Sequence, residues 1–481
     1  MTPDPESSLY IHGQWCAGAT TVINRNPSNL DDIIGHYAQA DNAQAAQAVD
    51  AARAAQPGWA QTPLEDKQRL LHAIGDALIQ RCDELGALLS REEGKTRPEG
   101  RGEVYRAGQF FHYYAAEVLR QIGDLADSVR PGISIEVTRE AVGVVAILSP
   151  WNFPIATAAW KIAPALAFGN AVVWKPANLT PASAVALTQV IHQAGLPAGV
   201  FNLVLGSGSG VGNALIHSDR IDAVSFTGSV PVGRQVAAAT APNFVRCQLE
   251  MGSKNALVIM DDADLDTAVQ AAVVGAFSST GQKCTASSRL IVTETMHDAF
   301  VDALIKRLRT LVVGPALDDG VFMGPVVDDT QLTANLRWVD RARALGGELA
   351  FGGTRLDCAT PGYFMAPTVF INTDNAWDVN QEELFAPLAC VIRVRDLDEA
   401  IATVNDTRFG LTAGIVTQSL KSATRFKREA QSGCVMVNLP TAGTDYHVPF
   451  GGRKQSSYGP REQGQYAKDF YTIIKTSYQQ A

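Results

Sequence analysis

The sequence has no apolar run of about 20 residues, the length that a membrane-spanning helix needs, so no membrane contact is expected. Its first residues, MTPDPESSLY, lack the charged and apolar regions of a signal peptide. Basic residues are in deficit, since 40 Lys and Arg stand against 49 Asp and Glu, a net charge of −9. This balance excludes the basic surface that is typical of nucleic-acid-binding domains. A few local cations could still bind an anionic small molecule.

Paired cysteines are also lacking. The seven cysteines form no CxxC pair and are scattered as Cys16, Cys82, Cys247, Cys284, Cys358, Cys390 and Cys434. An odd number in a long chain favours a reducing cytoplasm over a disulfide framework or a metal site, so we expect a cytoplasmic protein without bound metal. The 481 residues, 46% of them hydrophobic and 19% charged, predict two or three lobes with large cores.

Strands and helices alternate along most of the chain. The first part predicts short strands within 9–40, a helix from Asp41 that ends at Pro57-Gly58, and helices at 64–91 and 99–120. Strands at 141–150, 171–177, 200–206 and 223–229, with helices between them, predict a parallel, doubly wound sheet. Strands at 289–293, 365–371 and 388–394, with helices at 296–311, 329–346 and 397–404, predict a second α/β lobe. The tail FYTIIKTSY alternates like an exposed strand, which favours pairing with another subunit.

A candidate nucleophile lies in GQKCTASSRL, residues 281–290, directly after an apolar helical stretch. The neighbouring cation of Lys283 is expected to lower the pKa of the Cys284 thiol and so to raise its thiolate fraction. A lone cysteine is more often an inert buried side chain, so this segment alone leaves both interpretations open.

Three other polar residues occur where chemistry is expected, each with an ordinary alternative. Glu250, between Leu249 and Met251, is either a buried base with a raised pKa or half of an ion pair. Asn152, in PWNFP, could stabilise an oxyanion or could only form a turn. Lys175 ends an apolar strand, at the sheet edge where ligands bind, and either hydrogen-bonds a ribose hydroxyl or is a solvated strand end. The Gly-rich run GSGSGVG (206–212) is either a phosphate loop or a flexible turn, whereas FTGS (226–229) starts a helix, a better phosphate site.

Taken in order, these segments resemble the aldehyde dehydrogenase superfamily over nearly the whole chain. The matching stretches are PWNFP (150–154), WKPA (174–177), FTGS (226–229), LEMGSK (249–254), GQKCTA (281–286), EELFAP (382–387) and PFGGRKQSSYG (449–459). The resemblance implies an α/β fold with two doubly wound lobes and a small β oligomerisation segment. The implied division is 1–123 and 141–246 for dinucleotide binding, 247–433 for catalysis, 434–465 as a return segment that completes the active site, and 124–140 with 466–481 as oligomerisation strands of a homodimer or homotetramer.

The same resemblance implies a role for each matching residue. Cys284 is expected to attack the aldehyde, Asn152 to hold the oxyanion, and Glu250 to activate water for hydrolysis of the thioester. Lys161 and Glu462 match a pair near that base. The residues that match NAD- or NADP-binding positions are Ser149, Pro150, Trp151, Lys175, Ala177, Asn178, Gly208, Gly212, Phe226, Gly228, Ser229, Gly233, Met251, Gly252, Glu383 and Phe385. The residues expected to bind the aldehyde are Phe153, Trp160, Lys283, Thr285, Arg289, His447 and Phe450.

Three positions depart from the family pattern. Ser253 and Ala386 stand where glycine is usual, and neither change removes a catalytic group. Asn178 stands where strongly NAD-preferring members often have a glutamate, so we expect NADP to be accepted as well as NAD.

The run from Val435 to Thr472 resembles the 2-oxoglutarate semialdehyde (2,5-dioxopentanoate) dehydrogenases. This implies an anionic aldehyde, which needs a cation in the tunnel because an unpaired buried charge is costly. Trp160 occupies a position where some semialdehyde enzymes have arginine, which leaves succinic semialdehyde and uncharged aromatic or aliphatic aldehydes open. Three other classes share parts of this pattern: an inactive structural relative, a CoA-acylating enzyme and a thioesterase without redox chemistry. The presence of Cys284 and Glu250 and of the matched cofactor positions disfavours all three.

Overall fold

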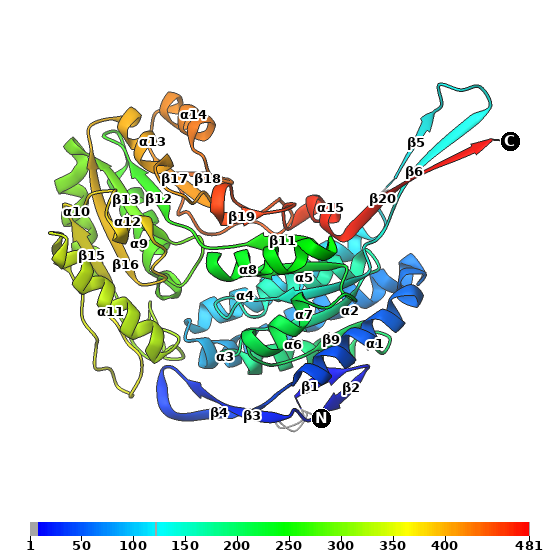
Figure 1. The fold of residues 1–481 in the computed structure, drawn as a ribbon. Coiled ribbons are helices and arrows are strands. Elements are labelled where there is room, and N and C mark those ends of the chain that lie inside the picture. Colours follow the sequence, from blue (N-terminus) through cyan, green and yellow to red (C-terminus); the bar gives the residue numbers. More distant parts are fainter. Residues whose placement is uncertain (1–7, 121–122, 481) are drawn as a thin grey trace.

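A computed structural model of the protein describes residues 8–120 and 123–480. Residues 1–7, 121–122 and 481, which the expected division of the chain includes, lie outside the described part. The described residues form two large, mostly parallel sheets, a three-stranded sheet and a two-stranded hairpin (Figure 1). The N-terminal strands are β1 (Leu9–Ile11), β2 (Gln14–Cys16), β3 (Thr20–Asn26) and β4 (Asn29–Gln39). Four helices follow them: α1 (Asn42–Ala60), α2 (Leu64–Gln80), α3 (Cys82–Glu93) and α4 (Arg97–Glu117).

The first large sheet has the order β19-β11-β10-β7-β8-β9-β1-β2, and its five central strands are parallel. Its elements are β7 (Val144–Leu148), α5 (Ala156–Ala167), β8 (Ala171–Lys175), α6 (Pro181–Gln193), β9 (Phe201–Leu203), α7 (Asn213–Ile216), β10 (Ala223–Thr227), α8 (Val230–Thr240), β11 (Arg246–Glu250) and β19 (Ser457–Tyr458). Alternate residues of β7 enter different cores: Val145 packs with residues of α2 to α6, whereas Ala146 packs with residues of α1, α7 and α8. Helices therefore cover both faces of this sheet.

The second large sheet has the order β14-β15-β16-β13-β12-β17-β18, and all its pairs except β14–β15 are parallel. Its elements are β12 (Asn255–Ile259), α9 (Leu265–Phe277), β13 (Ser287–Thr293), α10 (Glu294–Leu308), α11 (Asp329–Ala344), β14 (Glu348–Phe351), β15 (Thr368–Ile371), α12 (Asp378–Gln381), β16 (Leu388–Val394), α13 (Leu397–Asn405), β17 (Thr412–Val416), α14 (Leu420–Glu429) and β18 (Cys434–Val437). Leu257 of β12 packs with residues of α9 and α10, and Val258 packs with residues of α13 and α14. The predicted α/β class with two doubly wound lobes is confirmed.

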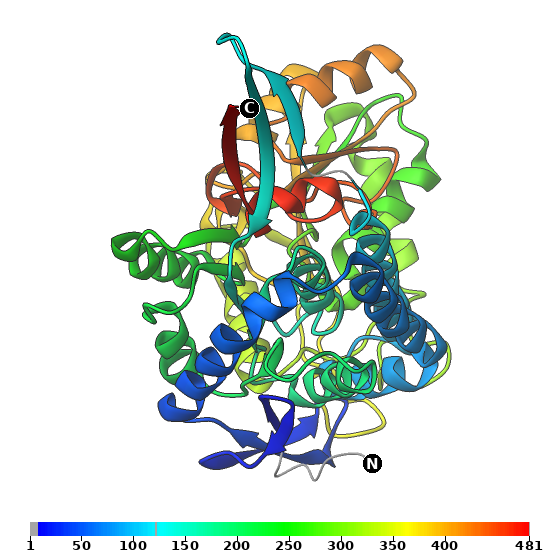
Figure 2. The ribbon, with the colours of Figure 1, turned by 90° about the vertical axis from the view of Figure 1, so that its right-hand side faces the viewer.

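The third sheet projects from the body of the molecule in both views (Figures 1 and 2). It has the antiparallel order β20-β6-β5, formed by β5 (Asp124–Asp127), β6 (Ile133–Ala141) and β20 (Thr472–Gln480), which follows the short helix α15 (Lys468–Tyr471). Its apolar side chains are open to solvent, with Leu125 81% and Tyr478 60% exposed. The oligomerisation role of 124–140 and 466–481 stays a prediction.

The structure corrects three of the predicted boundaries. Helix α1 passes through Pro57 and ends at Ala60, because Trp59 is buried and its indole donates a 3.0 Å hydrogen bond to the Leu166 carbonyl. The expected helix 64–91 is two helices that break at Arg81, and the apolar spacing continues because both pack on α4. Strand β11 belongs to the first sheet, so the chain passes to the second lobe after Glu250 rather than at residue 246.

Candidate active site

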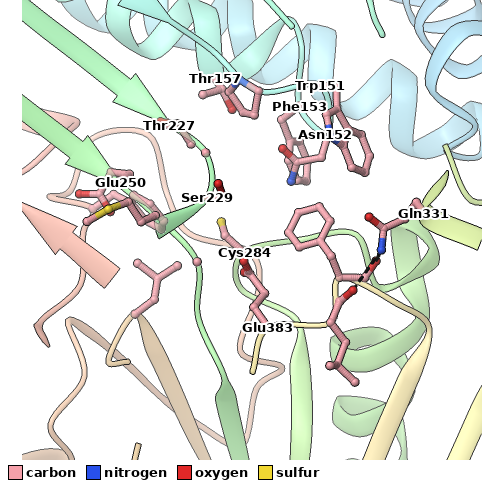
Figure 3. Close-up of a pocket in the computed structure, with 18 of the residues that line it drawn as sticks. Trp151, Asn152, Phe153, Thr157, Thr227, Ser229, Glu250, Cys284, Gln331 and Glu383 are labelled. Atoms are coloured by element: carbon pink, nitrogen blue, oxygen red, sulfur yellow. Dashed lines mark hydrogen bonds between the residues drawn. The ribbon is translucent and has the colours of Figure 1, made fainter. Parts of the chain in front are cut away.

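The Cys284 segment starts where α9 ends in a strained turn. Ser279 and Thr280 have φ of 50° and 55°, and Gly281 has φ of 66°. A Cβ on Gly281 would lie 2.2 Å from the Ala386 carbonyl oxygen, so only glycine fits this close approach. The Asn255 amide then donates a 2.8 Å hydrogen bond to the Cys284 carbonyl and fixes the segment. Backbone strain of this kind persists only where the surroundings hold it, and here it aims the thiol into a cavity (Figure 3).

Two cavities meet at Cys284. One, of about 280 Å³, lies toward the ends of the first-sheet strands, and the other, of about 430 Å³, lies between α4, α5 and the loop after β18. The residues that line both are Phe153, Trp160, Cys284 and Phe450. The thiol can therefore contact one molecule from each side, as a reaction between an aldehyde and a cofactor requires.

Asn152 lies across the first cavity from Cys284 (Figure 3). Its side-chain amide donates a 2.9 Å hydrogen bond to the Gln282 carbonyl, two residues before the thiol. Its own carbonyl accepts a 2.6 Å hydrogen bond from Lys95, which also pairs with Glu103 at 2.7 Å. Glu103 in turn accepts from the backbone N–H groups of Ile155 and Ala156. This buried network holds the amide beside the thiol, where a preorganised donor can stabilise an oxyanion.

Glu250 ends β11 and lines the same cavity with its carboxyl group buried. Burial raises its pKa well above the usual value, and the nearby Glu462 carboxylate raises it further. The Ser457 hydroxyl acts in the opposite direction, since it donates a 2.6 Å hydrogen bond to Glu250 Oε2. A carboxyl group with a raised pKa is suited to take a proton from water near neutral pH.

Lys161 and Glu462 form a buried ion pair, as the family resemblance implied. Lys161 also donates a 2.9 Å hydrogen bond to Ser225, which donates to Gln248 at 3.1 Å. Neither Lys161 nor Glu462 lines the two cavities, so they act on Glu250 through its surroundings.

The expected activation of the thiol by Lys283 is wrong for this structure. Burial raises the pKa of Cys284 above its usual value, and the carboxylates of Glu383 and Glu250 raise it further. The Lys283 amine turns away and donates hydrogen bonds to Val274 O at 3.1 Å and Ser278 Oγ at 2.5 Å. Burial lowers the pKa of Lys283 itself to about 8. The surroundings of Cys284 in this structure therefore favour the neutral thiol over the thiolate.

Half of the expected cofactor residues line the smaller cavity: Pro150, Trp151, Gly228, Ser229, Met251, Gly252, Glu383 and Phe385. The Glu383 carboxylate accepts a 2.9 Å hydrogen bond from Ser253 N–H, and burial raises its pKa to about 7. A Cβ on Gly252 would lie 2.2 Å from Glu383 Oε2, so a side chain there would displace the Glu383 carboxylate. The Trp151 and Phe385 rings meet edge to face at 5.5 Å.

The other expected cofactor residues lie outside that cavity: Ser149, Lys175, Ala177, Asn178, Gly208, Gly212, Phe226 and Gly233. Gly233 adjoins a residue that lines the cavity, and Gly212 adjoins Lys175. A Cβ on Gly233 would lie 2.3 Å from Met251 Sδ, and a Cβ on Gly212 would lie 3.7 Å from Lys175 Cδ. The buried Lys175 amine donates to the Pro176 carbonyl at 2.8 Å, and burial lowers its pKa to about 8. Asn178 is exposed.

These residues fit a dinucleotide on two observations. Thr227 Oγ1 is buried without a hydrogen-bond partner among the described residues, at the edge of the cavity. The Ser229 side chain makes no capping bond to α8, so the first N–H groups of this helix are available to a phosphate. The Gly-rich run forms a π-helical turn, Gly208–Gly212, against the Lys175 stem.

The larger cavity is lined by five of the expected substrate residues: Phe153, Trp160, Lys283, Thr285 and Phe450. Arg289 does not line it, which corrects its expected role. The Arg289 guanidinium is buried and donates to the carbonyls of Lys254, Thr403 and Val404 and to Asn375 Oδ1. His447 is exposed and also lies outside the cavity, with its ring against Tyr446.

Sequence motifs missed several lining residues. On the substrate side these are Glu99, Arg106, Phe110, Ser278, Ser279 and Gln463, and on the cofactor side Thr157, Thr227, Gln331, Leu384 and Leu411. Thr227 and Leu384 lie inside the matching stretches FTGS and EELFAP, whereas Arg106 and Phe110 lie on α4, where the aromatic cluster predicted core packing. Among residues 8–120 and 123–480, no helix is long and apolar enough to cross a bilayer. Within the same ranges, no three His, Cys, Asp or Glu side chains come together as metal ligands.

Known proteins share this arrangement over almost the whole chain. A model of the aldehyde dehydrogenase family matches residues 15–477. The alpha-ketoglutarate semialdehyde dehydrogenase of Haloferax volcanii is 43% identical over 481 residues, 99% of either chain. The alpha-ketoglutaric semialdehyde dehydrogenase of Bacillus subtilis is 40% identical over 471 residues, 97% of this chain and 96% of its own.

Solved structures show the same likeness. The crystal structure of betaine aldehyde dehydrogenase from Staphylococcus aureus in complex with NAD+ has a TM-score of 0.96 and 33% sequence identity. The match covers 98% of this chain and 95% of that chain. It therefore includes both lobes and the projecting sheet.

Proposed function

Because the chain belongs to the aldehyde dehydrogenase family, we propose that it oxidises 2-oxoglutarate semialdehyde to 2-oxoglutarate with NAD or NADP. The match to the family model and the likeness to solved structures confirm the family and the fold that the sequence predicted. The proposed substrate is supported by the relatives named for this aldehyde and by the C-terminal run that resembles them. The observation that carries the proposal is the Cys284 thiol at the meeting point of two cavities, one of which is lined by half of the residues expected to bind a dinucleotide.

Cys284 is the proposed nucleophile. Its sulfur adds to the aldehyde carbon and gives a thiohemiacetal, which is needed because an aldehyde carries no leaving group. The Asn152 amide, held by Lys95 and the Gln282 carbonyl, is placed to donate to the oxygen that becomes negative. NAD or NADP, when bound, supplies the hydride acceptor for this oxidation. The acyl group is then left on Cys284 as a thioester.

Glu250 is the proposed base for hydrolysis of that thioester. Its carboxylate faces the cavity, and the raised pKa lets it take a proton from water as the water attacks the acyl carbon. Retention of this base supports transfer of the acyl group to water over transfer to CoA. The buried Lys161–Glu462 pair acts as a positioning element, because the charge of Glu462 helps to set the pKa of Glu250.

Assembly and location are also proposals. The projecting sheet, with Leu125 and Tyr478 open to solvent, supports a homodimer or homotetramer. All seven cysteines are free thiols, which supports the reducing conditions of the cytoplasm.

A steady-state comparison of aldehydes tests the substrate. We expect 2-oxoglutarate semialdehyde to exceed succinic semialdehyde, benzaldehyde and hexanal in kcat/KM by at least about tenfold, the ratio that 1.4 kcal/mol produces. Omission of CoA should leave the rate unchanged. A higher kcat/KM for benzaldehyde or hexanal would refute the substrate, and a strict requirement for CoA would refute hydrolysis.

A further inference from the structure

One cation in the larger cavity, Arg106, has no hydrogen-bond or ion-pair partner among the described residues. Arg106, on α4, lines this cavity and is partly buried. Its guanidinium lies 5.4 Å from the centre of the Tyr446 ring, which holds it in place. Within the described residues it makes no hydrogen bond and no ion pair. An arginine that lines a cavity without an acceptor is suited to bind a planar anion that enters from solvent.

The other charged groups of the cavity already have partners. The Lys283 amine is bonded to Val274 O and Ser278 Oγ. The Glu99 carboxylate accepts from Ser279 N–H at 2.7 Å and from Thr96 N–H at 2.9 Å. Glu103 is neutralised by Lys95 at 2.7 Å. Among the charged side chains that line this cavity in the described part of the chain, Arg106 is therefore the one whose charged group makes no hydrogen bond at all.

Two buried polar groups of the same cavity also lack partners among the described residues. They are the indole Nε1 of Trp160 and the side-chain Oε1 of Gln463, whose residue is 1% exposed. A buried donor without an acceptor is costly and is often completed by a ligand. The Gln463 amide can present its NH2 group instead of its oxygen by turning about its last bond.

The order of these groups along the cavity matches the order of groups in one substrate class. Trp160 lines both cavities together with Cys284, whereas Arg106 lines only the larger one. A donor thus lies near the thiol and a cation lies beyond it. In 2-oxoglutarate semialdehyde the 2-oxo group lies between the aldehyde and the carboxylate.

We propose that Arg106 binds the carboxylate of a 2-oxo acid aldehyde and that the Trp160 indole N–H donates to its 2-oxo oxygen. The Gln463 amide supports the same carboxylate. This subsite rests on the proposed function and deepens it, since it names the residues that select an anionic aldehyde. It also explains how a chain with tryptophan at position 160, rather than arginine, accommodates such a substrate.

Arg106→Met is the direct test. We expect the ratio of kcat/KM for 2-oxoglutarate semialdehyde to that for hexanal to fall by about 10- to 100-fold, the value of hydrogen bonds to a charged group. The loss should appear mainly in KM, and Arg106→Lys should recover part of it. Arg101→Met is the matched control, because Arg101 lies on the same helix, outside the cavity, and pairs with Asp83. It should leave the ratio unchanged.

The role of Trp160 is tested with glutarate semialdehyde, which has the same carbon count and carboxylate but no 2-oxo group. Wild-type enzyme should prefer 2-oxoglutarate semialdehyde over this analogue, and Trp160→Phe should reduce that preference. An unchanged preference would overturn the assignment of the indole donor.

Inhibition by 2-oxoglutarate separates this inference from the proposed function. With hexanal as the varied substrate, 2-oxoglutarate should compete in the wild type and compete at least about tenfold more weakly in Arg106→Met. If the wild type prefers 2-oxoglutarate semialdehyde but Arg106→Met changes neither the ratio nor the inhibition, the subsite is wrong and the function stands. If the wild type prefers hexanal and 2-oxoglutarate still competes through Arg106, the proposed substrate fails and the anion subsite stands.

Discussion

Replacement of Ser457 by alanine should shift the pH dependence of hydrolysis in a defined direction. Ser457 donates a 2.6 Å hydrogen bond to Glu250 Oε2, and this bond favours the ionised carboxylate. Hydrogen bonds to charged groups contribute about 1.5–3 kcal/mol, and one pKa unit corresponds to about 1.4 kcal/mol. Loss of the hydroxyl should therefore raise the already elevated pKa of Glu250 by about 1–2 units.

The consequence appears on the acid side of the pH profile. Glu250 must be ionised to act as a base, so activity rises with pH through its pKa. In Ser457→Ala the rise should move about 1–2 units toward higher pH, so kcat measured below the wild-type rise should fall by about 10- to 100-fold. Steady-state kcat at saturating substrate and cofactor measures this, after a pre-steady-state burst has shown that hydrolysis limits the rate.

Ser457→Thr is the matched control, since it keeps a hydroxyl at the same position and should keep the wild-type profile. A Ser457→Ala profile that does not move, or that moves toward lower pH, would refute Glu250 as the base. A uniform loss at every pH would indicate misplacement of the carboxylate rather than a change in its pKa.

Three further predictions follow from side chains around the site. The kcat/KM with NADP should lie within about 100-fold of that with NAD. Replacement of the exposed Asn178 by glutamate should lower kcat/KM for NADP selectively, because a carboxylate repels the 2′-phosphate. An equal change for both cofactors would contradict this. Arg289→Met should lower the free energy of unfolding by about 2–4 kcal/mol, because it leaves buried carbonyls unpaired, and should not change aldehyde preference. Denaturant titration and the aldehyde panel measure these two effects, and an altered preference would return Arg289 to the substrate site. The rate at which iodoacetamide alkylates Cys284 in the free enzyme, followed by mass spectrometry, should keep rising up to about pH 9.5, a unit above the ordinary thiol pKa. A plateau of this rate near neutral pH would show an activated thiolate.

Local sequence was sufficient for the parallel strands of the first sheet and for the motifs, but not for β12, β17 and β18 of the second sheet. The apolar strands ending at Leu148, Lys175 and Thr227 are buried on both faces, and such runs are typical of a doubly wound sheet. Because parallel strands present their carboxyl ends at one edge, motifs that follow those strands come together in space. Asn152 and Glu250 are found in this way, whereas Cys284 follows helix α9 and is found from its own motif.

Contacts between distant segments were not predictable. Ser457 and Glu250 are 207 residues apart in sequence, and no local pattern joins a hydroxyl to that carboxylate. Lys283 adjoins Cys284 in sequence, yet its amine bonds to Val274 and Ser278 because burial demands acceptors for its protons. Pro57 was expected to end a helix that tertiary burial of Trp59 extends by one turn.

The substrate cavity shows the same limit. Arg106 lies among the apolar residues of α4, and only the fold brings it to the same cavity as Trp160 and Gln463. Arg289 follows the Cys284 motif closely, yet its guanidinium turns to backbone carbonyls on the other side of β13. Proximity in sequence was a poor guide to which cation faces the substrate.

The central claim is that a thioester forms on Cys284 and that Glu250 directs its hydrolysis. The most direct measurement is the intact mass of Glu250→Gln after mixing with 2-oxoglutarate semialdehyde and NAD, followed by peptide mapping. We expect one equivalent of reduced cofactor per active site and one acyl group on Cys284, with Cys284→Ala giving neither. Full steady turnover in Glu250→Gln without an acyl-enzyme, or an acyl group on another residue, would contradict the account.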